Sequence, residues 1–176
     1  RFACLVLAPG VPLHFPAPHP VVEKARAAGI EIICDIEILH RCRHGRTVIG
    51  ITGTNGKSTT TALTGHVLNA CGIRAAVGGN IGTPVLALDL PLDAFVIELS
   101  SYQLDLCPTF KPDIAVLLNI TPDHIDRHGS LAGYVESKKR IFGKGKRAVI
   151  AVDDDITRAI ADEMKDAVRV SAAAPE

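Results

Sequence analysis

The sequence contains very few aromatic residues, with no tryptophan, two tyrosines and five phenylalanines among 176 residues. Its hydrophobic fraction is nevertheless 47%, so any core that it forms is aliphatic. Such a core favours a parallel β-sheet covered by helices, because strands buried on both faces consist of continuous valine, isoleucine and leucine runs. The length suits one compact domain, or one domain and part of another.

The sequence also lacks an excess of charge of either sign. Its 19 lysine and arginine residues balance 19 aspartate and glutamate residues, so the formal net charge is zero. Such a chain has no overall field that would attract nucleic acid or an anionic membrane. It has no apolar run near the roughly 18 residues that a membrane-spanning helix needs. We therefore expect neither nucleic acid nor a membrane among its partners, and we expect a cytoplasmic location.

Disulfide and zinc-binding patterns are missing as well. The cysteines are odd in number, form no C-x-x-C pair and lie mostly within apolar runs: Cys4, Cys34, Cys42, Cys71 and Cys107. This pattern is typical of buried free thiols in a reducing compartment.

Methionine is equally scarce. The chain begins at Arg1, has Met164 as its single methionine, and stops a few residues after a predicted strand at 168–171. We expect it to be a piece of a longer chain.

Predicted strands and helices alternate over most of the chain. The first part predicts a strand at 2–8, a proline-rich loop at 9–20, a helix at 20–28, a strand at 30–34 and a short helix at 35–40. After a polar segment at 41–46, which we interpret as a linker, the pattern predicts strands at 48–52, 75–78, 94–99, 114–119, 147–152 and 168–171, with helices at 57–70, 131–142 and 156–167. This alternation predicts an α/β fold with a doubly wound, mostly parallel sheet that binds ligands at the carboxyl ends of its strands. We place a domain boundary near Arg46, which divides the chain into residues 1–46 and 47–176.

A phosphate-binding loop is the strongest motif. It lies between a predicted strand and a predicted helix and has the sequence Gly53-Thr54-Asn55-Gly56-Lys57-Ser58-Thr59. Glycines let successive backbone N–H groups surround an anion, a lysine reaches the β- and γ-phosphates, and the next hydroxyl can ligate Mg²⁺. The spacing is shorter than G-x-x-x-x-G-K-[ST], because Ile51 stands five residues before Gly56. The motif predicts an ATP site; a plain Gly-Lys turn is the alternative.

Charged side chains lie at the ends of two later predicted strands, 94–99 and 114–119. Glu98 lies near the end of the strand at 94–99, where a carboxylate in a P-loop protein binds Mg²⁺ directly or through water. The strand at 114–119 leads into a loop with the side chains Asp123, His124, Asp126, Arg127 and His128. Their spacing fits neither H-E-x-x-H nor a zinc site, but they could supply a second Mg²⁺ ligand and a cation for phosphate. The alternatives are a solvated or hydrogen-bonded loop carboxylate at position 98 and an ordinary surface loop after position 119.

Two further segments carry weaker signals. Residues 78–82 form a second glycine-rich loop after a strand, which would let a ligand approach the backbone closely. Lys138, Lys139 and Arg140 form a basic cluster within a predicted helix, and such clusters are usually solvated faces. Glu136 is spaced to pair with Arg140.

Taken together, these motifs resemble the Mur ligase family. The resemblance covers residues 2–152 and rests on the order and spacing of five segments: 53–59, 79–82, 98–104, 119–128 and 134–142. Within the family it is strongest to the ligases that add D-glutamate to UDP-N-acetylmuramoyl-L-alanine. It implies that residues 1–46 are the second half of a UDP-substrate-binding domain and that 47–176 are most of a central ATPase domain. It also implies that a C-terminal domain is missing and that the chain alone is inactive or nearly so. Separately, we expect a monomer.

The family mechanism implied by this resemblance uses ATP, two Mg²⁺ ions and an acyl phosphate. The substrate carboxylate is phosphorylated, the amine of D-glutamate attacks it, and phosphate leaves as the amide forms. The resemblance assigns the phosphates to Lys57 and the surrounding backbone, the first Mg²⁺ to Ser58 and Glu98, and the second to His124. Lys138 matches a family lysine that CO₂ converts into a carbamate, an anionic ligand for the second Mg²⁺; Lys139 is the competing match.

The resemblance also assigns substrate contacts. Asn80 and Ser100 match positions that contact the muramoyl substrate or its phosphates, and Pro9 and Gly10 match a loop near the uridine diphosphate. Ala8 stands where many relatives have serine, so this chain has no hydroxyl there. Other activities left open are another Mur-type ligase, a folylpolyglutamate synthetase-like enzyme, and a P-loop kinase or nucleotide-binding module.

Overall fold

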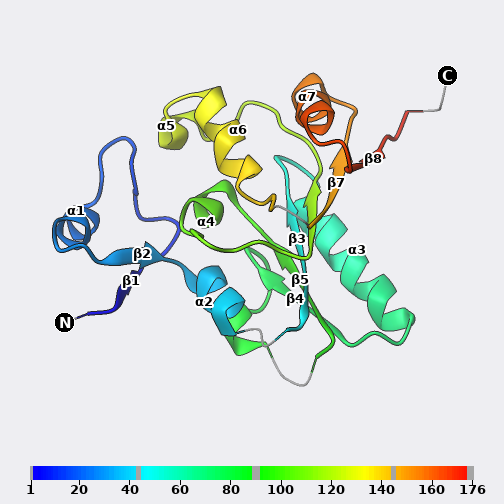
Figure 1. The fold of residues 1–176 in the computed structure, drawn as a ribbon, viewed down its shortest axis with the longest axis horizontal. Helices are drawn as coiled ribbons and strands as arrows, with labels where there is room; N and C mark the ends of the chain where they lie inside the picture. The colour runs from blue at the N-terminus through cyan, green and yellow to red at the C-terminus, as the bar shows by residue number, and fades with distance from the viewer. Residues whose placement is uncertain (1, 43–44, 89–91, 144–145, 174–176) are drawn as a thin grey trace.

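The computed structural model describes residues 2–42, 45–88, 92–143 and 146–173 (Figure 1). Its main body is a six-stranded sheet with the strand order β4-β5-β3-β6-β7-β8, in which all neighbouring strands are parallel. The strands are β3 (Thr47–Thr52), β4 (Ala75–Gly79), β5 (Ala94–Glu98), β6 (Ile114–Leu117), β7 (Arg147–Ala151) and β8 (Val168–Val170). The predicted α/β fold with a doubly wound parallel sheet is confirmed.

Helices cover both faces of this sheet. One face carries α3 (Lys57–Ala70), and the other carries α2 (Asp35–Cys42) and α4 (Ser101–Asp105) (Figure 1). Successive side chains of a strand point to opposite faces, so Val48 packs in one apolar cluster with Ile36 of α2, whereas Ile49 packs in another with Leu68 of α3. The other helices beside the main sheet are the 3₁₀ turn η1 (Val85–Ala87), α5 (Ile125–His128), α6 (Leu131–Lys139) and α7 (Asp155–Glu163).

The strand order reverses around β3. This strand lies between β5 and β6, so the carboxyl ends of these three strands are adjacent. In doubly wound sheets, ligands bind outside such a reversal point. The segments that begin there are the phosphate loop after β3, the segment after Glu98 and the loop after β6.

A separate two-stranded parallel sheet precedes the main one. It pairs β1 (Cys4–Val6) with β2 (Glu31–Ile33), and α1 (Pro20–Ala27) connects them. Helix α2 ties this unit to the main domain: Arg41 of α2 pairs with Glu31 of β2 at 2.6 Å, and the buried Glu37 carboxylate accepts hydrogen bonds from Arg41 Nε at 2.9 Å and from the Phe110 N–H at 3.0 Å. The two sheets divide on either side of Arg46, and the division into residues 1–46 and 47–176 stays a prediction.

Several local predictions differ from the structure. The sequence pattern misses α4 and α5, because helices of four or five residues show no periodicity. The helix predicted at 131–142 ends at Lys139, and α2 extends through Cys42 into the predicted linker, of which residues 43 and 44 lie outside the described part. The prediction of buried thiols is wrong for Cys42 and Cys71, which lie at exposed helix ends; Cys34 and Cys107 are buried.

Candidate active site

The phosphate loop connects the carboxyl end of β3 to the start of α3. Gly56, immediately before the helix, has a φ of +79°, a left-handed conformation that glycine adopts without strain. The first N–H groups of any helix have no partner within the helix itself, and no described side chain caps them here. Lys57 Nζ donates to the Thr54 carbonyl at 2.8 Å, which folds the lysine back over the loop. Free N–H groups, the helix dipole and a lysine together suit an anion such as phosphate.

The Glu98 carboxylate lies beside this loop at the end of β5. It is 1% exposed, and it accepts hydrogen bonds from Ser58 Oγ at 2.7 Å and from Asn80 Nδ2 at 2.8 Å. A buried carboxylate needs such partners, because burying the charge without them is costly. A solvated carboxylate at position 98 is therefore excluded, whereas the hydrogen-bonded alternative agrees with these contacts, which place the Glu98 oxygens with Ser58 at the phosphate loop.

Lys138 enters the site from α6. Its side chain is 1% exposed, and Nζ donates to the Gly53 carbonyl at 2.7 Å and lies 4.7 Å from the centre of the Tyr134 ring. Burial and, next, the positive charge of Lys57 lower the pKa of Lys138 to about 7. The solvated-face interpretation is wrong for this residue, and much of its amine is neutral near pH 7.

The two residues that follow Lys138 have other partners. Lys139 Nζ pairs with Glu163 at 2.9 Å and with Glu136 at 3.5 Å, and Arg140 pairs with an aspartate of α4 at 3.2 Å. The predicted pair of Glu136 with Arg140 is therefore wrong. Of the two candidate lysines, Lys138 is the one that reaches the phosphate loop.

His124 lies directly before α5 in an uncommon backbone conformation. Its φ of +50° is rare for a residue with a side chain, and such residues cluster at functional sites. Its ring centre lies 5.0 Å from that of Tyr102 and 6.3 Å from that of Tyr134, and Nε2 lies 3.4 Å from Asp123 Oδ2. The Tyr134 hydroxyl lies 3.1 Å from Thr54 Oγ1, so a single aromatic ring separates His124 from the phosphate loop.

Asn119 begins the family-like segment 119–128, but the sequence motifs predict no role for it in the site. Its Oδ1 accepts hydrogen bonds from the N–H groups of Thr54 at 3.1 Å and Asn55 at 2.8 Å, and its Nδ2 donates to the Asn55 carbonyl at 3.0 Å. Its place at the end of a predicted strand and at the start of that segment was the available signal that it lies near the site. Its contact with a loop 64 residues earlier depends on the strand order.

A serine, a histidine and an aspartate lie in a row beside the site, with one hydrogen-bond contact between the serine and the histidine. Ser101 Oγ lies 2.9 Å from His128 Nε2, and His128 Nδ1 lies 3.5 Å from Asp105 Oδ2. This row differs from a hydrolase triad because Ser101 is only 2% exposed and cannot meet a substrate. Burial lowers the pKa of His128, and Ser137 Oγ donates to the Ser101 carbonyl at 2.7 Å. These contacts join α4, α5 and α6, which carry the residues around the phosphate loop.

A cleft of about 800 Å³ opens between the two-stranded unit and the main sheet. Its lining includes all four residues matched to substrate contacts: Pro9, Gly10, Asn80 and Ser100. Asn80 also donates to Glu98, as described above, so the cleft and the phosphate loop are neighbours. Arg127 Nη1 donates to the carbonyl of Gly10, one of the lining residues, at 3.2 Å.

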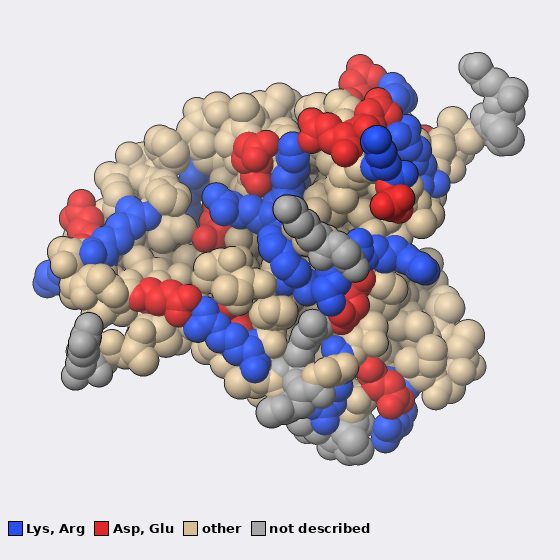
Figure 2. All heavy atoms as spheres, in the orientation of Figure 1, with Lys and Arg blue, Asp and Glu red and all other residues tan. Residues whose placement is uncertain are grey.

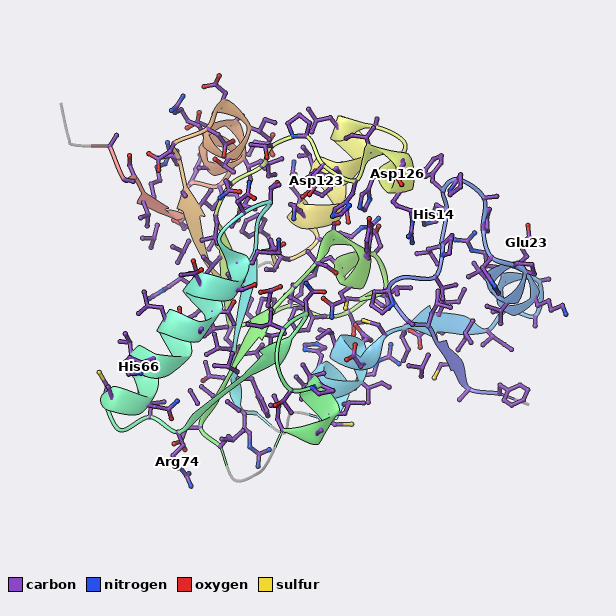
Figure 3. The ribbon with its side chains drawn as sticks, turned by 180° about the vertical axis from the view of Figure 1, so that it is seen from behind. His14, Glu23, His66, Arg74, Asp123 and Asp126 are labelled. Carbon is purple, nitrogen blue, oxygen red and sulfur yellow. The ribbon has the colours of Figure 1, made fainter. Side chains whose placement is uncertain are left out.

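Charged side chains of both signs are mixed on the face of the molecule drawn in Figure 2. Figure 2 shows lysine and arginine side chains interspersed with aspartate and glutamate over this face, in agreement with the zero net charge. In Figure 3, Asp123 lies toward the N-terminal end of α3, whereas His66 and Arg74 lie toward its other end. The site thus occupies one end of α3.

The described part of the chain lacks both a membrane-spanning helix and a cluster of metal-binding side chains. No helix there combines the length and apolarity needed to cross a membrane. No group of three or more histidine, cysteine, aspartate or glutamate side chains there is placed to hold a metal ion by itself. Mg²⁺ commonly binds through one or two protein ligands, water and substrate phosphates, and Ser58 with Glu98 is a pair of that kind.

A sequence model of the Mur ligase middle domain matches residues 51–174, which is more than half of the chain. The chain belongs to the Mur ligase family. The family membership predicted from the motifs is confirmed.

Two ligases of the family are similar to the chain over nearly all of its length. The chain is 54% identical over 180 residues to UDP-N-acetylmuramoylalanine–D-glutamate ligase of Caulobacter vibrioides, which covers 96% of the chain and 38% of that ligase. It is 50% identical over 165 residues to the ligase of the same name from Paramagnetospirillum magneticum, which covers 91% of the chain and 36% of that ligase. The chain thus spans less than two fifths of the length of these relatives.

Solved structures of Mur ligases share the fold. MurF ligase from Thermotoga maritima, in complex with ADP, matches with a TM-score of 0.61 and 25% identity over 77% of this chain and 35% of that one. UDP-N-acetylmuramate:L-alanyl-gamma-D-glutamyl-meso-diaminopimelate ligase from Neisseria meningitides matches with a TM-score of 0.61 and 22% identity over 86% of this chain and 53% of that one. The family fold therefore extends over most of the chain.

Proposed function

We propose that the chain is part of an ATP-dependent ligase that joins D-glutamate to UDP-N-acetylmuramoyl-L-alanine in peptidoglycan synthesis. The observation that carries this proposal is the 54% identity, over 96% of the chain, to a relative named for that reaction. The cleft beside a phosphate loop supports it, because the reaction brings a large acid substrate to a nucleotide. Residues 1–46 would belong to the UDP-substrate-binding domain and 47–176 to the central ATPase domain.

The phosphate loop and the start of α3 would bind the nucleotide. Backbone N–H groups within residues 53–59 and the Lys57 ammonium would hold the phosphates, because both present positive charge to an anion. Lys57 would release the Thr54 carbonyl and turn toward the β- and γ-phosphates.

The oxygen ligands that Mg²⁺ prefers are present beside this loop. Ser58 Oγ and Glu98 Oε2 are 2.7 Å apart, so both side chains face one position next to the phosphate loop and would hold the first ion there. Bound Mg²⁺ offsets the negative charge that accumulates when a carboxylate and a triphosphate approach each other.

Lys138 is suited to become a carbamate. Its neutral amine, which the pKa of about 7 makes available, would attack the carbon of CO₂, form an N–C bond and release one proton. The ammonium of Lys57 would then stabilise the anion that results. The carbamate oxygens and the His124 imidazole would hold the second Mg²⁺.

The cleft would hold the sugar-peptide acid. Asn80, Ser100, Pro9 and Gly10 would bind the UDP-N-acetylmuramoyl part, so that the terminal carboxylate points toward the phosphate loop. The carboxylate attacks the γ-phosphorus and ADP leaves; the amine of D-glutamate then attacks the acyl phosphate and inorganic phosphate leaves. Positioning the two reactants in one cleft supplies much of the rate, since it replaces a bimolecular encounter.

The test is a phosphate-release assay of the full-length ligase with ATP, UDP-N-acetylmuramoyl-L-alanine and D-glutamate. We expect release that requires both substrates, and little or none from residues 1–176 alone. A stable phosphorylated product that forms without an added amine would indicate a kinase. Nucleotide binding without turnover would indicate a binding module. A preference for another amino acid would indicate a different Mur-type ligase. A monomeric state and a cytoplasmic location stay predictions.

A further inference from the structure

The phosphate loop is fastened to the loop after β6 by a dense set of hydrogen bonds. Besides the three side-chain bonds of Asn119, the Asn119 carbonyl accepts from the Thr54 N–H at 2.9 Å. The Thr54 hydroxyl accepts from the Thr121 N–H at 3.0 Å and lies 3.2 Å from the Thr121 carbonyl. Two neighbouring residues of one loop are therefore held by two residues of the other.

These bonds determine which N–H groups remain for a ligand. The N–H groups of Thr54 and Asn55 both donate to Asn119, so they are already satisfied by the protein. The Thr60 N–H donates to the Gly56 carbonyl at 3.0 Å and is the first to be satisfied within α3. No described group accepts from the N–H groups of residues 56–59, so these donors, at the positive end of the helix dipole, are the ones left for a ligand.

Asn119 also connects this donor set to His124. Both residues belong to the segment between β6 and α5, and His124 has the left-handed φ described above. Because Asn119 and Thr121 are bonded to the phosphate loop, a change in the shape of that loop displaces the segment that carries His124.

We infer that Asn119 is a positioning residue of the nucleotide site: it holds the phosphate loop in the shape that leaves the Gly56–Thr59 N–H groups for a ligand and couples that loop to the His124 segment. This inference rests on the nucleotide-binding part of the proposed function. It predicts that the loss of Asn119 weakens nucleotide binding although the Asn119 side chain is engaged with Thr54 and Asn55, because the loop must then be ordered when the ligand binds.

Asn69, at the other end of α3, provides a matched control. Its Nδ2 donates to the Gly65 carbonyl at 2.8 Å and to the Ala75 carbonyl at 2.9 Å, and its Oδ1 accepts from the Ala75 N–H at 3.1 Å. Asn69 thus makes three side-chain bonds to the main chain, as Asn119 does, but far from the site. The two alanine variants should lose similar stability.

The experiment measures Mg-ADP affinity by calorimetry and melting temperature in the full-length ligase. We expect Asn119→Ala to raise the Kd by about tenfold or more, and Asn69→Ala to change it less than about twofold, at similar losses of melting temperature. The KM for ATP should rise in Asn119→Ala while the KM for D-glutamate stays near its normal value. Hydrogen exchange should become faster for the Thr54 and Asn55 amides and stay slow in the middle of α3.

A second variant covers the case in which Asn119→Ala does not fold. Asn119→Asp keeps the shape and the Oδ1 acceptor but replaces the Nδ2 donor by an oxygen that faces the Asn55 carbonyl. We expect it to fold and to bind Mg-ADP at least tenfold more weakly. The reason is that a hydrogen bond to the Asn55 carbonyl is replaced by a repulsive contact between two oxygens. Affinities within twofold of the parent in the variants that fold would overturn the inference, as would equal losses in the Asn69 control. If the parent ligase itself binds no Mg-ADP, the proposed function fails instead, which is a separate result.

Discussion

The two ends of α3 are built differently. At the C-terminal end, backbone groups close on one another, since the Gly72 N–H donates to Asn69 and the Ile73 N–H to Leu68, and the Asn69 side chain adds further bonds. At the N-terminal end, no described side chain caps the helix, and Lys57, Ser58 and buried Glu98 gather around the open N–H groups. The comparison teaches that the fold satisfies its own polar groups at one end and leaves them for a ligand at the other.

The largest effect should come from removing the cation at the open end. Lys57→Ala should lower kcat/KM for ATP by about 1,000-fold, because it removes a charge-assisted contact to the phosphates that no neighbour replaces. Steady-state kinetics of the full-length ligase measures this. The exposed Lys24 of α1 provides the control, and Lys24→Ala should keep normal kinetics. Near-normal ATP kinetics in Lys57→Ala would contradict the placement of the phosphates at this end of α3.

The next effect should separate two adjacent lysines of α6. Lys138→Ala should lose about 100-fold in activity, since it removes the group proposed to carry the carbamate, and millimolar short carboxylic acids should restore part of the loss. Lys139→Ala, which removes exposed ion pairs, should change stability by less than about 1 kcal/mol and leave the activity intact. Activity assays with and without acetate or formate distinguish the two. Equal effects of both substitutions would make Lys138 an ordinary lysine.

Two glycines with left-handed backbones should differ in their tolerance of a methyl group. At Gly79 (φ +107°), a Cβ would lie 2.3 Å from the Glu98 carbonyl oxygen, whereas at Gly72 (φ +82°) nothing lies within 4 Å. Gly79→Ala should therefore cost about 2–4 kcal/mol of unfolding free energy and shift Glu98. Gly72→Ala should cost about 1 kcal/mol, from backbone strain alone. Urea unfolding measures both costs, and an equal cost at the two positions would mean that β4 and β5 pack less closely than described.

The smallest predicted effect concerns pH. Only the neutral amine of Lys138 reacts with CO₂, and the pKa near 7 lies well below the ordinary value of 10.5, so the reactive form is lost as the pH falls through about 7. The neutral fraction drops about tenfold between pH 8 and pH 6. Activity should fall accordingly, and added bicarbonate should restore part of it near pH 7. A profile that bicarbonate leaves unchanged from pH 6 to pH 8 would argue against the carbamate.

Features encoded by neighbouring residues were predictable from the sequence. The phosphate loop depends on glycines, a lysine and a hydroxyl within seven residues, and the parallel sheet on aliphatic runs of strand length. The short helix α4 was also encoded locally, because Ser100 and Gln103 form a capping box, the S-x-x-Q pattern that marks a helix start. This capping pattern predicts a helix start at Ser100, which the periodicity of so short a helix does not show.

Features that depend on strand order were not predictable in the same way. The burial of Lys138 requires α6 to pack against the phosphate loop, and the sequence shows only a basic cluster that is usually solvated. The bonds from Asn119 to Thr54 and Asn55 require β6 to lie next to β3. The exposure of Cys42 and Cys71 likewise follows from the positions of helix ends rather than from the apolar residues around them.

The most direct test is a crystal of the full-length ligase soaked with Mg²⁺ and a non-hydrolysable ATP analogue. The phosphates should lie at the start of α3 between Gly56 and Thr59, with the metal ion between Ser58 and Glu98. Phosphate density at any other place on the molecule, with the start of α3 empty, would contradict the account.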